Sequence, residues 1–294
     1  MSNIVKNYLR VLEVISSLSI EFNDTLRAGR KLKMSDKEVV ALSLTAEFMS
    51  IDSENNLFKQ LDISQIPNLV ERSQFNKRRK RLFEFSETVR LKLASHFLEY
   101  EDCFVIDSMP LEICKTARQN RIKICKEDFE TAPSKGFCAS QNSWFYGYKL
   151  HGVCSVSGVF HSLDITKANV HDIQILNDVK HQLSDCMLLG DRGYLSSTQQ
   201  LDLFETANIV LETPMRTNQR NYKKQAYIFR KSRKRIETLF SQLCDQFMIR
   251  RNYAKSFQGF KTRILAKITA LTLVQYINKF IFERPINNVK IQII

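Results

Sequence analysis

The chain has 294 residues, of which 44% are hydrophobic, and it contains only eight glycines and five prolines. This composition excludes a disordered chain and predicts a buried core in one large domain or two smaller ones. The formal net charge of +13 favours an acidic polymer as partner. Nucleic acid is preferred to a membrane as that partner, because the sequence has no run of 18 uncharged residues.

Targeting and metal-binding patterns in the sequence indicate the cell compartment and argue against some kinds of metal site. The N-terminal residues lack the charged-then-apolar order of a signal peptide, so we expect a cytoplasmic protein. The seven cysteines include no Cys-x-x-Cys pair, which argues for reduced thiols and against a zinc module. Four histidines recur every ten residues from His151 to His181, but this spacing fits no ligand period on one helix or strand.

The first hundred residues predict helices throughout. Residues 4–22 carry the apolar stripe of an amphipathic helix. Ser35 and Glu38 have the spacing of a capping box and predict the start of a second helix. A strongly basic helix is predicted from Ser73, and apolar helical sequence follows it to Leu98. We therefore expect an all-helical region over residues 1–100.

The basic helix in this region has the composition of a DNA reader. Short helices joined by tight turns, the last with amide and cationic side chains outside, are typical of helix-turn-helix-like proteins. Contacts to base edges are expected from Gln74, Asn76 or Arg78, and contacts to phosphates from Lys77, Arg79 and Arg81. The alternative is a solvated basic helix that packs on the next domain. The turn lacks the glycine of a helix-turn-helix, which weakens the signal for a DNA reader.

The pattern changes to strands at Cys103. The apolar run Cys103–Ile106 is too short for a helix and predicts a buried strand that ends at Asp107. Residues 108–143 are polar, and we interpret them as a connection or small insertion. Two strand-like runs, 146–156 and 159–165, flank a two-residue turn and predict a β-hairpin.

A second aspartate follows a second buried run. A helix is expected to begin near His171, and the apolar run Cys186–Leu189 then leads into Asp191. Ser196 opens another helix, and residues 209–211 predict a further strand. This alternation of strands and helices predicts an α/β layered domain over residues 101–294 with a C-terminal helix.

The helix around Glu237 combines an apolar stripe with strong positive charge. Fifteen Lys and Arg residues but only two acidic residues lie between Met215 and Lys267. Ile236 and Leu239 belong to a stripe at helical spacing, and Glu237 lies at its edge. Glu237 could simply pair with Arg233 one turn earlier, for a few tenths of a kcal/mol. Alternatively, it is a metal-binding carboxylate among cations that bind phosphate.

Asp107, Asp191 and Glu237 form a plausible convergent set of carboxylates. Clustered carboxylates repel one another unless a cation joins them, and hard oxygen ligands select Mg²⁺ or Mn²⁺. Two such ions about 3.5–4 Å apart can catalyse phosphoryl transfer, and the surrounding Lys and Arg would hold the phosphodiester backbone. No Gly-x-Ser-x-Gly elbow or Gly-rich phosphate loop competes with this interpretation. An aspartate at a strand end can also be just a turn former.

Five ordered segments resemble a known family. They are Val105–Ser108, Tyr146–His151, Ala168–Asp172, Leu189–Tyr194 and Arg233–Phe240. Together they resemble the DDE insertion-sequence transposases, and within them the group numbered nine-eight-two. Members of that group have a similar length and a similar helical N-terminal region with a basic Phe-Asn-x-Arg-Arg stretch.

The resemblance implies an α/β fold, with a ribonuclease H-like mixed sheet flanked by helices. It implies that Asp107, Asp191 and Glu237 are the catalytic, metal-binding acids and hold two ions, Mg²⁺ or Mn²⁺. The implied reactions are cleavage at terminal inverted repeats and attack of the freed 3′ hydroxyl on target DNA. Double-stranded DNA is therefore the expected partner, bound by a homodimer in the nucleoid, with no role for a membrane.

The sequence departs from related families around the third acid. Those families place Tyr, Arg, Glu and Lys where this chain has Arg230, Arg233, Glu237 and Cys244. The Tyr and Lys are absent, so another cation would have to hold the terminal phosphate. The contacts to DNA expected near the acids are Arg230, Arg233, Arg235, Lys149 and Arg192.

Two other functions use the same features. One is a structure-selective nuclease or resolvase with the same two-metal core, which would prefer branched DNA to specific terminal repeats. The other is a DNA-binding protein whose active site has decayed, which would bind the repeats without cutting them.

Overall fold

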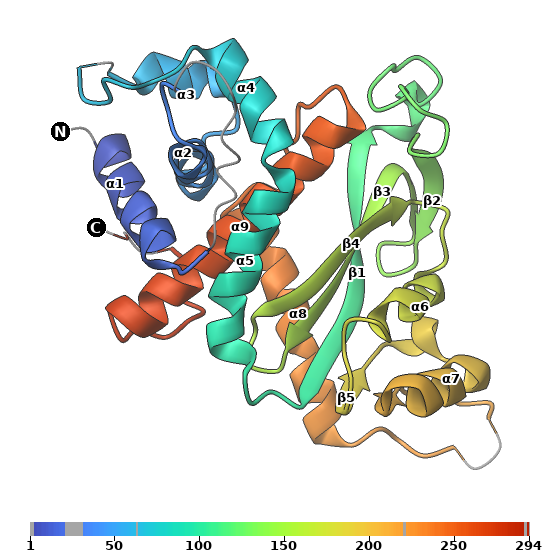
Figure 1. Cartoon of the computed structure of the whole chain (residues 1–294). Helices are drawn as coiled ribbons and strands as arrows, with labels where there is room; N and C mark the ends of the chain where they lie inside the picture. Colours follow the sequence, from blue (N-terminus) through green and yellow to red (C-terminus); the bar gives the residue numbers. More distant parts are fainter. Residues whose placement is uncertain (1–2, 21–31, 63, 220–221, 291–292, 294) are drawn as a thin grey trace. The chain divides into compact units, whose positions relative to one another are not determined.

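The computed structural model describes residues 3–20, 32–62, 64–219, 222–290 and 293 (Figure 1). The chain forms two compact units, one from residues 1–96 and 242–294 and the other from residues 97–241. This division differs from the expected domains, 1–100 and 101–294. The C-terminal segment belongs with the N-terminal helices because its long apolar helix packs against them.

The first unit is helical in its described part. Its helices are α1 (Asn3–Ser17), α2 (Asp36–Phe48), α3 (Glu54–Gln60), α4 (Arg72–Arg81), α5 (Phe83–Leu98) and α9 (Phe257–Tyr276), with a π-helical extension over Ile277–Ile281. The structure confirms the predicted helical N-terminal region. Helix α1 ends at Ser17, before the expected end, and residues 21 and 22 lie outside the described residues.

A local sequence signal sets the start of α2 but not the start of α4. At α2, Ser35 Oγ accepts from the backbone N–H of Glu38, 3.2 Å away, and Glu38 Oε2 accepts from the N–H of Ser35 at 2.6 Å. The predicted capping box is thus confirmed. Helix α4 instead begins at Arg72, one residue before the predicted start, and its N-cap residue Glu71 makes no side-chain cap.

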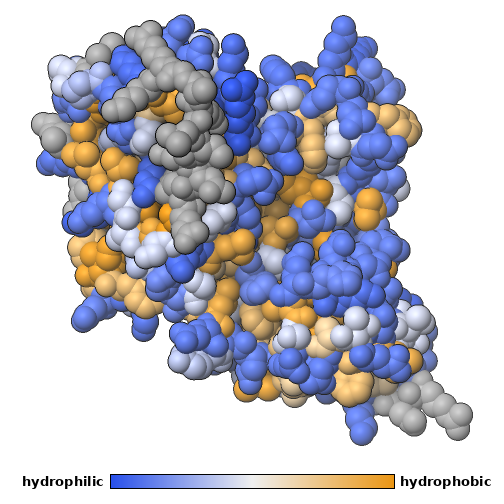
Figure 2. Space-filling model, viewed as in Figure 1, coloured by the Kyte–Doolittle hydropathy of each residue, from blue (hydrophilic) through white to orange (hydrophobic). Residues whose placement is uncertain are grey.

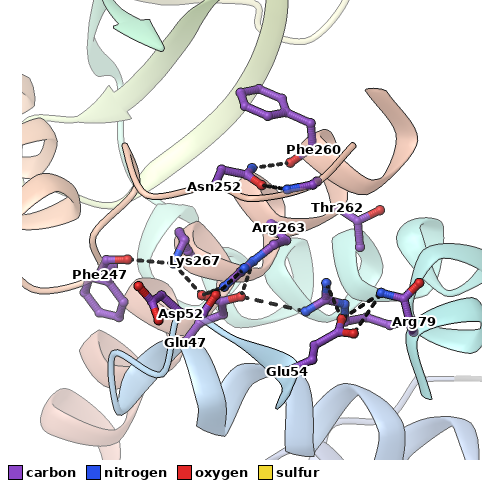
Figure 3. Close-up of polar contacts among 12 residues, drawn as sticks. Glu47, Asp52, Glu54, Arg79, Phe247, Asn252, Phe260, Thr262, Arg263 and Lys267 are labelled. Carbon is purple, nitrogen blue, oxygen red and sulfur yellow. Dashed lines mark hydrogen bonds and ion pairs between the residues drawn. The ribbon is translucent and has the colours of Figure 1, made fainter. Parts of the chain in front are cut away.

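A buried charge network joins four helices of the first unit, α2, α3, α4 and α9 (Figure 3). Glu47 of α2 is 1% exposed and accepts from Lys267 Nζ at 2.5 Å and from Arg263 Nε at 3.3 Å, both on α9. Arg79 of α4 lies 3.9 Å from Glu47 and 2.8 Å from Glu54. Burial alone would raise the pKa of Glu47, but the three cations together hold it below its usual value. The network ties α4 and α9 to α2.

The C-terminal helix has the length and composition of a membrane-spanning helix but is largely buried inside the protein. The segment Phe257–Ile281 is long and apolar enough to cross a membrane, but 78% of its most apolar window is buried inside the protein. Lys267 lies in its middle and is paired with Glu47. The prediction of a buried C-terminal helix is confirmed.

The second unit contains a six-stranded mixed sheet. Its strands are β1 (Cys103–Cys114), β2 (Ser134–Cys138), β3 (Ser143–Ser155), β4 (Phe160–Lys167), β5 (Cys186–Leu189) and β6 (Ile209–Glu212). The order is β2-β3-β1-β5-β6, and β4 also pairs with β3. Pairs among β1 to β4 are antiparallel, whereas β5 is parallel to both β1 and β6. This is the predicted ribonuclease H-like mixed sheet flanked by helices.

Helices cover both faces of the sheet. The short helix α6 (Leu176–Val179), preceded by a 3₁₀ turn from Asp172, and helix α7 (Ser197–Ala207) pack with Phe104, Ile106 and Leu188 on one face. Helix α8 (Tyr227–Asp245) approaches the other face at Gly152, where an added Cβ would lie 3.6 Å from the Phe240 ring. The two faces therefore have different partners.

Two strand predictions need correction. Strand β1 continues past Asp107 to Cys114, so the prediction that it ends at Asp107 is wrong. Residues 108–143 likewise hold the rest of β1, a 3₁₀ turn and β2. Met109 and Leu111 are buried and alternate with more exposed neighbours because β1 pairs with β3 along this stretch. The predicted β3–β4 hairpin is confirmed, with a turn of four residues, 156–159.

Candidate active site

Asp107 lies on the face of the sheet that α8 covers. In the antiparallel register it is directly opposite Gly152, and paired residues project to the same face. Gly152 faces Phe240 of α8, so the Asp107 side chain points toward the same side. The carboxylate is partly buried, and its Oδ1 accepts from the backbone N–H of Ser108 at 2.8 Å.

Asp191 follows the neighbouring strand. Strand β5 pairs in parallel with the first residues of β1, and Asp191 lies two residues beyond its end. Its Oδ1 accepts from the N–H of Gly193 at 2.7 Å and caps a short 3₁₀ turn, Arg192–Tyr194. The carboxylate thus forms a turn, which also fixes its position next to the strand that carries Asp107.

Glu237 projects from α8 next to the buried stripe. Its side chain is exposed, whereas Ile236 and Leu239 are 1% and 0% exposed. Among the residues that the structure describes, no ion pair joins Glu237 to Arg233. The structure therefore gives no support to the alternative that Glu237 serves only as the ion-pair partner of Arg233 within α8.

Asp191, Glu237 and Arg233 each act electrostatically on Asp107. The pKa of Asp107 is raised from 3.8 to about 7, mainly by burial, and the negative charges of Asp191 and Glu237 contribute to this rise. The Ser108 N–H and Arg233 act in the opposite direction without cancelling this rise. Burial is therefore the main cause of the rise, and repulsion by Asp191 and Glu237 adds to it.

The donor chemistry of this cluster fits a hard divalent cation. All three side chains are carboxylates, and a cation between them would relieve the repulsion that raises the pKa of Asp107. However, among the described residues no three His, Cys, Asp or Glu side chains lie close enough to form a ready-made metal site. The acids fit a metal in type and charge but are not gathered into a coordination shell.

A cationic pocket borders Asp191. Its volume is about 450 Å³, and it is lined by Asp191, Arg192, Pro214, Met215, Tyr222, Lys223, Lys224, Gln225, Arg230 and Arg233. Five cations and one acid make it suitable for a phosphate backbone. Three predicted DNA contacts, Arg192, Arg230 and Arg233, are in this lining. Lys223 and Lys224 were missed, although they belong to the basic stretch that the sequence analysis noted.

Two other cations that were predicted to contact DNA, Lys149 and Arg235, bond instead to residues of the second unit. Lys149 Nζ donates to Asp172 Oδ1 at 2.8 Å and to the Val170 carbonyl at 2.9 Å. Arg235 Nε donates to the Val156 carbonyl at 3.3 Å. These contacts tie Lys149 and Arg235 to the hairpin and its following loop, and neither residue lines the cationic pocket.

The predicted base-reading helix, α4 in the first unit, divides into two sets. Three predicted contacts are exposed at the spacing of one helix face: Gln74, Lys77 and Arg81. The other three bond to acids of nearby helices: Asn76 to Glu54, Arg78 to Asp36, and Arg79 to Glu47 and Glu54. The exposed set remains available to DNA, and the second set is engaged in holding α4.

The sequence analysis did not single out Tyr194. Its side chain is 1% exposed, and its hydroxyl makes no hydrogen bond to a described residue. Burial, followed by the negative charges of Asp172, Asp107 and Asp191, raises its pKa well above 10. The sequence signal that could have identified Tyr194 is its position in Leu189–Tyr194, one of the five segments that resemble the transposase family.

Residues 100–273 match the model of the transposase DDE domain family. The match covers more than half of the chain and includes all three acids. The chain belongs to this family. One solved structure, titled "Mos1 transposase paired-end complex with left transposon end", aligns with 88% of this chain and 85% of that chain. The identity is 12% and the TM-score is 0.24, a similarity too low to define the fold. The transposase DDE domain family generally uses divalent metal ions.

Proposed function

We propose that this DDE transposase binds the terminal inverted repeats of its own element, cleaves the element ends and joins the 3′ hydroxyl to target DNA. The observation that carries the proposal is that Asp191 and Glu237 raise the pKa of the partly buried Asp107, while Asp191 also lines a cationic pocket. Both features lie within the residues that match the family. Assignment to the group numbered nine-eight-two is part of the same proposal.

In the proposed mechanism, Asp107, Asp191 and Glu237 hold two ions, Mg²⁺ or Mn²⁺. When bound, such ions activate the attacking oxygen and stabilise the leaving oxygen. Arg233 acts on the acids electrostatically and also lines the pocket, so it holds the phosphate next to them. Lys223, Lys224 and the other pocket cations hold the adjoining backbone. Positioning and charge stabilisation supply most of the catalysis in phosphoryl transfer.

Recognition of the repeats is proposed for the exposed face of α4. Gln74 would contact base edges, while Lys77 and Arg81 would hold phosphates. The buried charge network fixes this helix against α2 and so holds the exposed face in one orientation. We further propose a homodimer that joins two DNA ends, acting in the cytoplasm on nucleoid DNA.

Strand cleavage tests the proposal directly. The substrate is a labelled duplex that carries the element ends, with Mg²⁺, analysed on a denaturing gel. Asp107→Asn, Asp191→Asn and Glu237→Gln should each reduce cleavage to background while the DNA complex persists in a mobility-shift assay. The reason is that each change removes a proposed charged ligand with little change in shape.

The controls for this test are exposed acids of the same unit. Asp178→Asn and Glu205→Gln should cleave at the wild-type rate. Full cleavage by any one of the three active-site variants would contradict its role. Preference of the wild type for branched DNA over the repeats would instead support a nuclease or resolvase.

The pocket cations should control the salt dependence of DNA binding. The double variant Lys223→Gln, Lys224→Gln is expected to reduce the slope of log K against log salt by about 0.9 for each phosphate that is no longer neutralised. The slope is measured by fluorescence anisotropy between low and physiological salt. Lys6→Gln with Lys92→Gln, two exposed lysines of the first unit, is the matched control. An equal reduction of the slope in both double variants would show general attraction without a role for the pocket.

A further inference from the structure

The end of the β2–β3 hairpin exposes two large aromatic side chains. Phe137 and Trp144 are 45% and 57% exposed, and they are directly paired across the two strands. Their ring centroids lie 5.3 Å apart in an edge-to-face arrangement, and Lys135 Nζ lies 4.5 Å above the Trp144 ring. We call Lys135, Phe137 and Trp144 the hairpin patch.

The two faces of this hairpin have opposite character. Phe145, which follows Trp144, points to the opposite face and is 2% exposed. A cross-strand aromatic pair contributes about 0.2–1 kcal/mol to hairpin stability, which explains why Phe137 and Trp144 are adjacent. It does not explain why both remain open to solvent. On the molecular face shown in Figure 2, hydrophilic residues dominate, and apolar residues form separate patches among them.

The charge of the hairpin favours an anionic partner with flat rings. Residues 134–147 contain one lysine and no acidic residue. Aromatic side chains beside a cation are the combination that stacks on unpaired nucleic-acid bases and also attracts their phosphates. A purely apolar protein surface would use the rings but would leave the lysine charge unmatched.

The hairpin patch lies on the same sheet face as Asp107. Trp144 and Gly152 are eight residues apart on β3 and therefore project to the same side, and Gly152 is paired with Asp107. At about 3.3 Å per residue, the patch is roughly 26 Å along the strand from Asp107. A DNA strand with one phosphate at the acids would bring bases about eight nucleotides away to the patch, at about 3.4 Å per nucleotide.

We propose that the hairpin patch stacks on an unpaired base of the DNA strand held for cleavage. Trp144 and Phe137 provide the stacking surface, and Lys135 holds the adjoining phosphate. This inference rests on the proposed function for the presence of DNA at the acids. It adds a contact to single-stranded DNA that is separate from the recognition of duplex repeats by α4.

The test uses the intrinsic fluorescence of Trp144, because it is the one tryptophan in the chain. The full-length protein is titrated in EDTA with a single-stranded oligonucleotide, a blunt duplex and a duplex with an unpaired overhang. The single strand and the overhang should quench the emission, and the blunt duplex should not. Phe137→Ala should weaken binding of the single strand by about tenfold, whereas Phe204→Ala, an exposed phenylalanine on α7, should bind normally.

Three results would overturn the inference. The first is unchanged emission when a mobility shift shows that the single strand is bound. The second is equal weakening by Phe137→Ala and Phe204→Ala. The third is an emission change that depends on protein concentration alone and disappears together with dimers in Phe137→Ala, which would identify a second copy of the chain as the partner.

The fluorescence test of the hairpin patch can succeed or fail independently of the proposed function. Because the titration needs no cleavage, Asp107→Asn should show the same quenching as the wild type. Quenching in a protein that never cuts DNA would support the patch and contradict the transposase mechanism. Cleavage without quenching would support the transposase mechanism and contradict the role of the hairpin patch.

Discussion

Replacing Asp107 with Asn is expected to stabilise the metal-free protein while it abolishes cleavage. The pKa of Asp107 is raised from 3.8 to about 7, so folding favours the protonated form of this carboxyl. The ionised form costs stability above pH 3.8, and the cost increases until about pH 7. A shift of about 3 units at about 1.4 kcal/mol per unit gives at most about 4 kcal/mol. Asn has nearly the same shape and no charge, so it avoids this cost.

The measurement is the midpoint of thermal unfolding in EDTA at pH 5 and pH 8. At pH 8 the midpoint of Asp107→Asn should exceed that of the wild type by several degrees. The difference should shrink at pH 5, where the wild-type carboxyl is largely protonated. Asp178→Asn, an exposed change in the same unit, should show no difference at either pH. A lower midpoint for Asp107→Asn at pH 8 would refute the expectation.

The same measurement tests metal binding without any cleavage. A ligand that binds the folded state raises its stability, so Mg²⁺ or Mn²⁺ should raise the wild-type midpoint. The ions should have little effect on Asp107→Asn, because one of the three carboxylates is missing. Equal stabilisation of both proteins would remove Asp107 from the proposed ligand set.

Replacing Glu47 with Gln is expected to destabilise the helical unit strongly. Glu47 is the shared partner of Arg79, Arg263 and Lys267, and its side chain is 1% exposed. Removal of one partner from a buried ion pair leaves charge without compensation and typically costs about 3–5 kcal/mol. Urea unfolding measures this loss, followed through the helical signal in circular dichroism.

A surface ion pair provides the matched control for this change. Glu13 pairs with Arg10 at 2.8 Å on α1, with its side chain 67% exposed, so Glu13→Gln should cost less than about 1 kcal/mol. The pKa of Glu47 is lowered from 4.5, so its contribution is present above pH 4.5 and is lost as the pH falls below that value. Glu47→Gln should lack this acid-dependent component. Equal urea midpoints for Glu47→Gln and the wild type would mean that the network adds no stability.

Local patterns predicted the local structure well. The capping box at Ser35 and the run Cys186–Leu189 each have their determinants within a few residues, and both elements form as expected. The length of β1 was missed because the continuous apolar run ends at Ile106, although Met109 and Leu111 continue the alternation of a strand. Pairing with β3, some forty residues later, extends β1 beyond Asp107.

The features that the sequence did not predict depend on contacts between residues far apart in the chain. The sequence marks Arg79 and Lys267 as cations but does not show that both lie near Glu47, which is more than two hundred residues from Lys267. Composition therefore indicated a DNA contact for Arg79, whereas the fold pairs it with acids. For Asp107, Asp191 and Glu237, membership of one metal-binding set stays a prediction. In the structure Asp191 and Glu237 raise the pKa of Asp107, but among the described residues the three acids do not form a ready-made metal site.

The discontinuous helical unit has a consequence for the order of synthesis. Residues 97–241 are translated between the two segments of that unit, which takes roughly 7–30 s at about 5–20 residues per second. During this interval Glu47 has been made, while Arg263 and Lys267 have not. The unit that carries the three acids can therefore form on the ribosome before the helix that completes the first unit emerges. A chain that stops early can carry all three acids and still lack the partners that secure α2.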